Sequence, residues 1–180
     1  ASLLTRLGKA YSFEVDVIDA QKVTELKISS TRIREALANG AISEANSLLG
    51  YAFELEGIVV HGEKRGRQLD YPTANLLLQD GKKLIPKPGV YWGVSNINNQ
   101  EYCVMVNIGH RPTYDNGALK VEVHILDWEG DLYGSNLHVS FMERIRDEQP
   151  FDNSNALKSQ LQADEQLCRT RYAQVLGSSQ

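Results

Sequence analysis

The stretch VYWGVSNINNQEYCVMVNI, residues 90–108, contains two runs of β-branched and aromatic side chains on either side of Asn98 and Asn99. Such runs favour extended strands. An asparagine pair between two strands is typical of a tight turn, because asparagine tolerates the left-handed backbone that hairpin turns require. The stretch therefore predicts an antiparallel hairpin.

Three further runs of the same kind lie outside this hairpin, at residues 53–60, 121–126 and 137–145. Glu129-Gly130-Asp131 supplies turn residues between the last two runs. Several short strands at this spacing predict an antiparallel β-barrel or a β-sandwich.

A helix is predicted at the end of the chain, after Pro150, with Asp152 or Ser154 as its cap. Its apolar stripe would pack on the sheet. The residues of that stripe are Leu157, Leu161, Cys168, Tyr172 and Val175. The tail at residues 177–180 is expected to fray.

The segment before the first of these strands follows a different pattern. Residues 13–17 alternate as a strand does, and two short helices are predicted after them. Ser30 or Thr31 would cap the first helix and Gly40 would end it; the second helix, with a cap and a terminal glycine of its own, would run from Ser43 to Gly50. One strand and two short helices bury too little surface to fold alone. Since the chain begins at Ala1 and its first methionine is Met105, we expect a processed product or a piece of a longer protein.

Composition and charge narrow the class of protein. The 180 residues include 19 Lys and Arg against 23 Asp and Glu, a net charge of −4, and 42% of them are hydrophobic. This supports a packed core and excludes a disordered chain. The sequence contains no long apolar run and no hydrophobic leader, so we expect a cytoplasmic protein. Cys103, Cys168 and the four histidines show no metal-ligand spacing, which argues against a zinc or disulfide scaffold and favours buried thiols.

The stretch HGEKRGRQLDYPTAN, residues 61–75, carries the most chemical information. Its first half has two glycines, Gly62 and Gly66, that let the backbone bend tightly and present N–H groups to an anion such as a phosphate chain. The cations of this loop are Lys64, Arg65 and Arg67. The glycine spacing is one residue too short for a Walker A loop, and Lys-Ser/Thr is missing. Taken alone, the glycines and charges fit a solvated connection between strands better than a phosphate site.

The second half of the stretch presents oxygen ligands from a stiff backbone. Pro72 fixes one φ and holds Tyr71 extended, so Thr73 and Asn75 offer a hydroxyl and an amide carbonyl at alternate positions. Neutral oxygens of this kind suit a magnesium ion that phosphate oxygens already neutralise. An ordinary turn at the start of a strand is the other interpretation.

Residues 121–126 place a carboxylate in the middle of a strand. Val121, Val123 and Ile125 would share one face, while Glu122 and His124 share the other. The Glu122 carboxylate could act as a base there, or it could simply belong to an exposed polar face.

The motifs and their order resemble the riboflavin kinase domain. They comprise Gly62–Asn75, Pro88–Tyr91, Asn107–Thr113, Val121–His124, Asp131–Gly134 and Arg144–Phe151. More closely, the chain resembles the C-terminal half of the bacterial bifunctional riboflavin kinase/FAD synthetase, because residues 28–34 are similar to the closing motif of its FMN adenylyltransferase domain. The resemblance runs from about residue 11 to residue 172.

This resemblance implies a mainly β fold, a six-stranded antiparallel Greek-key barrel with a C-terminal helix. Residues 51–176 would form the riboflavin kinase domain, and residues 1–50 would be a truncated α/β remnant of a nucleotidyltransferase domain. The implied reaction is the transfer of the γ-phosphoryl group of ATP to the 5′-hydroxyl of riboflavin, which gives FMN and ADP. The oligomeric state stays open, and neither nucleic acid nor a membrane is expected as a partner.

The resemblance also implies roles for individual residues. Glu122 matches the catalytic carboxylate, and a mobile flap would span residues 109–116. The ATP site would comprise Gly62, Lys64, Gly66, Arg67, Thr73, Asn75 and Tyr133. Mg²⁺ would bind at Thr73 and Asn75, and the flavin at Arg146 and Phe151.

Two departures from the family pattern carry consequences. Asp70 stands where the family usually has glycine; aspartate tolerates a left-handed backbone but adds negative charge near phosphates. The His-x-Gly-His-type motif of the adenylyltransferase half is absent from the sequence, so FAD synthesis is not expected. Two alternatives to the kinase are a small barrel that binds nucleic acid through the basic loop, and a flavin-binding module without turnover.

Overall fold

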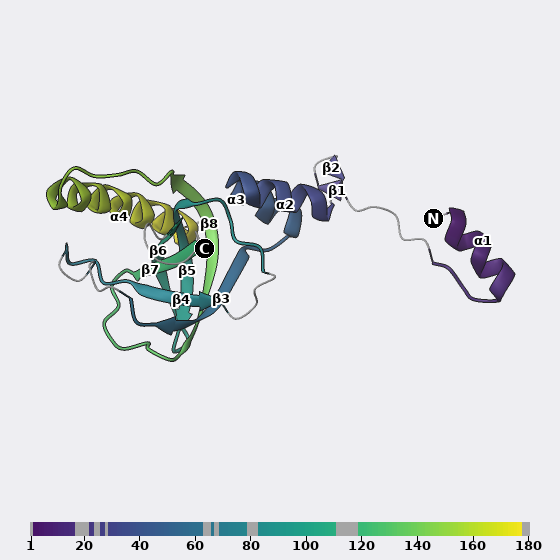
Figure 1. Ribbon diagram of the computed structural model, residues 1–180, viewed down its shortest axis with the longest axis horizontal. Helices are drawn as coiled ribbons and strands as arrows, with labels where there is room; N and C mark the ends of the chain where they lie inside the picture. The colour runs from purple at the N-terminus through teal and green to yellow at the C-terminus, as the bar shows by residue number, and fades with distance from the viewer. Residues whose placement is uncertain are drawn as a thin grey trace.

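Six antiparallel strands close into a barrel, and one long helix lies against its outer surface (Figure 1). The computed structural model describes residues 2–16, 22–23, 26–27, 29–62, 66, 69–78, 83–110 and 119–177. The strands of the barrel are β3 (Phe53–Val60), β4 (Ala74–Leu78), β5 (Gly89–Ile97), β6 (Gln100–His110), β7 (Leu119–Ile125) and β8 (Asn136–Arg146).

The order of strands around the barrel is β3-β4-β7-β6-β5-β8, and β8 closes on β3. Strands β5, β6 and β7 form a meander, and β8 returns to lie beside β5, which is a Greek-key arrangement. The expected six-stranded Greek-key barrel is therefore confirmed.

The hairpin predicted at residues 90–108 is formed by β5 and β6. The two strands pair from Gly89 opposite Ile108 to Ile97 opposite Gln100. Asn98 and Asn99 make the turn with φ values of 53° and 64°. Both are left-handed, as a two-residue turn between twisted strands requires.

Alternation along the strands produces two hydrophobic clusters. Inward-facing side chains such as Tyr91, Val106 and Val123 are completely buried and fill the barrel. Outward-facing side chains form a second cluster, which includes Cys103 of β6 and Cys168 of the long helix. Both thiols are free and buried, as predicted, and burial raises the pKa of Cys103 to about 11.

The long helix α4 (Ser154–Gly177) covers part of this outer cluster. Its cap is Asn153, whose Oδ1 accepts a hydrogen bond from the Ala156 amide at 2.9 Å, so the prediction of Asp152 or Ser154 was wrong. Cys168 lies at the centre of the predicted stripe and is buried, but Val175 is exposed. Residues 178–180 of the tail lie outside the described residues.

The N-terminal segment contains α1 (Ser2–Tyr11), β1 (Lys22–Val23), β2 (Leu26–Lys27), α2 (Ser30–Asn39) and α3 (Ile42–Leu49). The sequence did not predict α1, and the strand predicted at residues 13–17 is wrong, since residues 13–16 are irregular and Val17 lies outside the described residues. Gly40 and Gly50 end α2 and α3 with left-handed φ values, as expected. The caps differ: Ser29 caps α2, and α3 begins at Ile42 without a side-chain cap.

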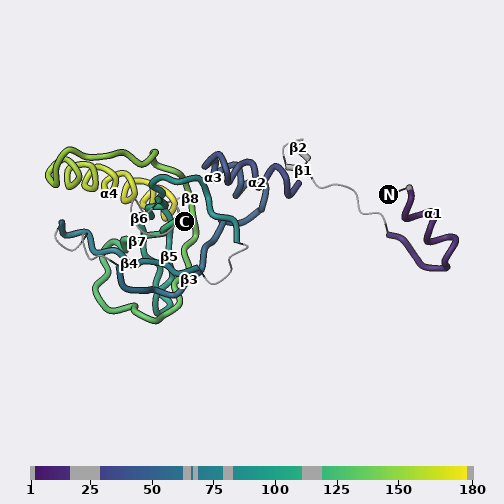
Figure 2. Tube along the Cα trace, viewed as in Figure 1, coloured from purple at the N-terminus to yellow at the C-terminus, as the bar shows by residue number. Residues whose placement is uncertain are grey.

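Helices α2 and α3 pack against the barrel, whereas α1 lies apart from it (Figure 2). Ala36, Leu37 and Ala45 belong to the same buried cluster as the barrel interior. The Asn46 side chain donates to the Phe141 carbonyl and accepts from the Phe53 amide, both at 2.8 Å. The boundary between residues 50 and 51 stays a prediction. No described helix is both long and apolar enough to cross a membrane.

Candidate functional site

Three polar side chains lie in a row across neighbouring strands. Asn75 of β4 is directly opposite Glu122 of β7, and Glu122 is directly opposite Asn107 of β6. Directly opposed residues point to the same face of a sheet. Since Val121 and Val123 point into the barrel, this polar row lies on its outer surface.

Glu122 is half-buried and has two close partners. The Lys120 Nζ lies 2.9 Å from its Oε1, and the Thr73 hydroxyl donates to the same oxygen at 3.4 Å. Sequence analysis had identified Thr73 and Glu122 separately, and the pairing of β4 with β7 brings them together. Lys120 was not singled out, although its position two residues before Glu122 places it on the same face.

Asn75 is buried, and its Oδ1 has no hydrogen-bond partner among the described residues. Gly62 packs directly on the Asn75 amide, which a Cβ at position 62 would overlap. Gly66 similarly packs on the backbone of Tyr71, whose amide donates to the Gly66 carbonyl at 2.9 Å. Close approach therefore requires both glycines. Lys64, Arg65 and Arg67 lie outside the described residues.

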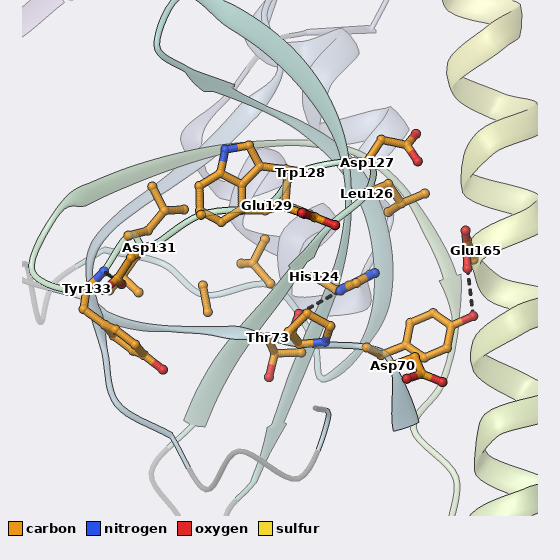
Figure 3. A pocket seen from close by; sticks show the side chains of 18 of the residues that line it. Asp70, Thr73, His124, Leu126, Asp127, Trp128, Glu129, Asp131, Tyr133 and Glu165 are labelled. Carbon is orange, nitrogen blue, oxygen red and sulfur yellow. Dashed lines mark hydrogen bonds between the residues drawn. The ribbon is translucent and has the colours of Figure 1, made fainter. Parts of the chain in front are cut away.

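The segment from Tyr71 to Asn75 is hydrogen-bonded to helix α4 on one side and to strand β7 on the other. The Tyr71 hydroxyl donates to Glu165 of α4 at 2.7 Å, and burial together with this carboxylate raises the pKa of Tyr71 to about 12. The His124 Nδ1 lies 2.7 Å from the Pro72 carbonyl, so Nδ1 carries the proton and donates it. Burial lowers the pKa of His124, which favours this neutral form. Figure 3 shows His124 and Glu165 with these two bonds dashed.

A cavity of about 380 Å³ lies between the polar row and the start of α4. Its lining includes Thr73 and Glu122 and the predicted flavin residues Arg146 and Phe151. The Arg146 guanidinium lies 5.9 Å from the centre of the Phe151 ring. The sequence did not reveal that Asp164, a buried residue of α4, holds Arg146 through contacts of 2.7 to 3.0 Å.

Figure 3 shows a larger cavity, of about 1030 Å³, which shares lining residues with the first. Thr73, Tyr71 and His124 line both cavities. Tyr133 lines only the larger one and stacks on His61, with 3.8 Å between ring centres.

Asp70, at the edge of the larger cavity, has the expected left-handed backbone, with φ at 67°. Its carboxylate pairs with the Lys158 ammonium of α4 at 2.6 Å, which offsets the extra negative charge. The predicted flap is described only at Gly109 and His110, which belong to β6; residues 111–118 lie outside the described residues.

The closed barrel carries a hydrogen-bonded carboxylate on its outer face, and two cavities of ligand size lie beside it. These features define the class of the protein as a small-molecule-binding barrel with the elements of an enzyme. Residues 49–172 match the flavokinase, or riboflavin kinase, family model, and the chain belongs to this family.

Curated relatives agree with this assignment. The chain is 40% identical over 164 residues to the bifunctional riboflavin kinase/FMN adenylyltransferase of Listeria monocytogenes, across 91% of this chain and 52% of that protein. It is 39% identical over 171 residues to the protein of the same name from Pseudomonas fluorescens, across 94% of this chain and 54% of that protein. The chain thus spans about half the length of these relatives.

A solved structure from Streptococcus pneumoniae, described as a macrolide-efflux protein, is 40% identical to this chain, with a TM-score of 0.82. The similarity covers 91% of this chain and 53% of the other. About half of that structure therefore has the fold of this chain.

Proposed function

We propose that this chain transfers the γ-phosphoryl group of ATP to the 5′-hydroxyl of riboflavin, giving FMN and ADP. The observation that carries the proposal is the position of Thr73, which lines both cavities and donates a hydrogen bond to Glu122. A flavin in the smaller cavity and a nucleotide in the larger one would meet at this point. Such an arrangement provides the proximity that phosphoryl transfer requires.

Glu122 would act as the general base. An alcohol is a poor nucleophile at neutral pH, so a carboxylate that accepts a hydrogen bond from the 5′-hydroxyl both orients it and takes its proton as the new O–P bond forms. The half-buried carboxylate faces the smaller cavity, as this role demands.

The smaller cavity would hold the flavin ring. Leu69, Met105, Leu157 and Leu161 give its wall an apolar character, and Phe151 offers an aromatic face for stacking. Arg146 lies beside Phe151, and its bonds to Asp164 fix its orientation toward α4. The remaining N–H groups of Arg146 could then bind a polar edge of the ligand.

The larger cavity would hold the nucleotide, with Tyr133 at its wall and the glycine loop near the phosphates. Gly62 packs on Asn75 and Gly66 on Tyr71, so both glycines lie beside the segment from Tyr71 to Asn75 that adjoins the cavities. Lys64 and Arg67 lie outside the described residues, and their proposed contact with the phosphates rests on the sequence and on the family resemblance.

Thr73 and Asn75 fit a magnesium ion. The buried Asn75 Oδ1 lacks a partner within the described part of the chain, and a hard cation satisfies such an oxygen. The ligands that we propose are the Thr73 hydroxyl and the Asn75 amide oxygen, and the described residues contain no cluster of three or more His, Cys, Asp or Glu side chains that could hold a metal. When bound with the nucleotide, magnesium neutralises phosphate charge.

One assay tests the proposal. The chain is incubated with riboflavin, ATP and Mg²⁺, and FMN, FAD and ADP are separated by chromatography. We expect FMN and ADP in equal amounts and no FAD. Flavin binding without ADP formation would favour the binding module and refute the kinase.

We also propose that the protein is cytoplasmic, because its proposed substrates, ATP and riboflavin, are cytoplasmic metabolites.

The variant Glu122→Gln tests the base. It keeps the shape of the side chain but cannot accept a proton, and we expect turnover to fall by about 10² to 10⁴-fold with an unchanged melting temperature. The matched control is Glu56→Gln, since Glu56 is an exposed carboxylate on β3 that lines neither cavity. Full turnover in Glu122→Gln would remove Glu122 from this role.

A further inference from the structure

We infer that Lys120 is a further catalytic residue, one whose ammonium group binds the phosphoryl group during its transfer. The inference rests on the proposed kinase function and extends it to a residue that neither the motifs nor the family resemblance identified. Three observations carry it: the contact of Lys120 with Glu122, its access to the smaller cavity, and the fixed position of the other cation there.

Lys120 is placed beside the reacting atoms by the strand that carries the base. Lys120 and Glu122 are two residues apart on β7, so both side chains lie on the outer face of the barrel. The Lys120 Nζ is 2.9 Å from the Glu122 Oε1, and both residues line the smaller cavity. A hydroxyl bound to Glu122 would therefore lie within a few ångströms of this ammonium.

The residue opposite Lys120 carries no side chain. Lys120 is paired on β6 with Gly109. The space above Gly109 is filled by the Glu148 carboxylate, which a Cβ at position 109 would overlap. Glu148 lines the smaller cavity together with Lys120 and Glu122, so the contact of Lys120 with Glu122 and its place in the lining are what give its ammonium access to this cavity.

Arg146, another cation that lines this cavity, is not available for the same task. Three contacts of 2.7 to 3.0 Å bind it to Asp164, whose side chain is only 2% exposed. Moving Arg146 toward a phosphate would leave a buried carboxylate without its partner, which is costly. Lys120 can leave Glu122 without this cost, because Glu122 becomes neutral when it takes the hydroxyl proton.

During the transfer step, negative charge is lost from Glu122 and is carried by the new phosphate ester, and the Lys120 ammonium can interact with both groups. The 5′-oxygen of riboflavin forms a bond to the γ-phosphorus and gives its proton to Glu122. The bond from this phosphorus to the bridging oxygen breaks, and ADP leaves with the electron pair. Glu122 becomes neutral while the new phosphate ester is negatively charged. Lys120 stays protonated throughout, and its attraction shifts from the carboxylate to the phosphoryl oxygens.

Comparison of product and substrate binding tests this role without requiring turnover. Riboflavin and FMN differ only by the phosphate, and the binding of each is followed through flavin fluorescence. In Lys120→Met we expect the Kd of FMN to rise by about 10-fold, as for the loss of one charge-assisted hydrogen bond, and the Kd of riboflavin to stay unchanged. Turnover should fall by about 10²-fold. Lys120→Arg keeps the charge and should recover part of both losses.

The control is Lys87→Met, which removes an exposed lysine paired with Asp147; neither residue lines either cavity, and neither Kd should change. Lys120→Gln provides a second variant should Lys120→Met melt at a lower temperature. Equal weakening of both flavins, or unchanged FMN binding, would overturn the inference. If the wild-type chain forms no FMN while Lys120→Met still selectively loses FMN binding, the kinase proposal fails and the phosphate contact stands.

Discussion

The ion pair between Arg146 and Asp164 allows a quantitative prediction about stability. Asp164 of α4 is 2% exposed and accepts hydrogen bonds from the Arg146 Nε and Nη2 and from Gln160 at 2.7 to 3.0 Å. Asp164→Asn keeps the size of the side chain but removes its charge. It also replaces one acceptor oxygen by an NH₂ group that would face another donor.

The expected cost follows from burial. Removing one partner of a buried ion pair costs about 3 to 5 kcal/mol, because the other charge is left without compensation. The Arg146 side chain is 19% exposed, so water can partly solvate it, and we expect a loss of about 3 kcal/mol. With an m-value of about 2 kcal/mol per M, the urea midpoint should fall by about 1.5 M.

Urea unfolding, followed through the fluorescence of the buried Trp92, measures this loss. Asp70→Asn is the matched control, since the Asp70–Lys158 pair, at 2.6 Å, is no longer than the 2.7 Å Arg146–Asp164 pair but its carboxylate is 80% exposed. An exposed pair contributes less than about 1 kcal/mol. Asparagine also tolerates the left-handed φ of 67° at this position. Equal midpoint shifts in the two variants would refute the argument that burial sets the cost.

Three further predictions concern other contacts. Gly62→Ala should displace the Asn75 amide, because a Cβ at position 62 overlaps it. Turnover should then fall by about 10-fold, and a magnesium titration should show that a higher Mg²⁺ concentration is needed for half-maximal rate. An unchanged titration would contradict the role given to this packing. Burial and Glu165 raise the pKa of Tyr71 from 10 to about 12, so the unfolded state releases the hydroxyl proton at a lower pH than the folded state does. The free energy of unfolding should therefore fall as the pH rises from 10 to 12, and urea midpoints should show that Tyr71→Phe lacks this decline. Asn46→Ala leaves two backbone groups without partners and should cost about 2 kcal/mol in the same assay, whereas a change below about 0.5 kcal/mol would show that these bonds do not hold α3.

The strands could be predicted where sequence patterning is local. Residues 53–60 match β3 fully, because alternation and β-branched side chains favour one conformation there. Residues 74–78, by contrast, have the sequence ANLLL, without β-branched or aromatic side chains, and were not named as a strand. They form β4 because they pair with β3 and β7, and this tertiary context outweighs their weak propensity. Only the family resemblance supplied the sixth strand.

The candidate site was predicted in parts. Thr73, Asn75 and Glu122 were identified from residue chemistry and resemblance, and the structure brings them together. Thr73 and Glu122 are 49 residues apart in the sequence, and their proximity depends on the pairing of β4 with β7, which no local pattern specifies. The roles of Asp164 and Glu165 were not predictable, because a single acidic residue on a helix gives no indication of its distant partner.

Because α2 and α3 pack on the barrel, the segment that contains the proposed site is shorter than the segment that the chain needs to complete its core. The family match begins at residue 49, and every residue proposed for the site follows it. Yet Ala36, Leu37 and Ala45 complete the barrel's hydrophobic cluster, and Asn46 binds the backbone of two of its strands. A chain cut at residue 51 would retain the chemistry but expose part of its core. The smallest piece suited to biophysical work therefore begins near Ser29, where α2 is capped.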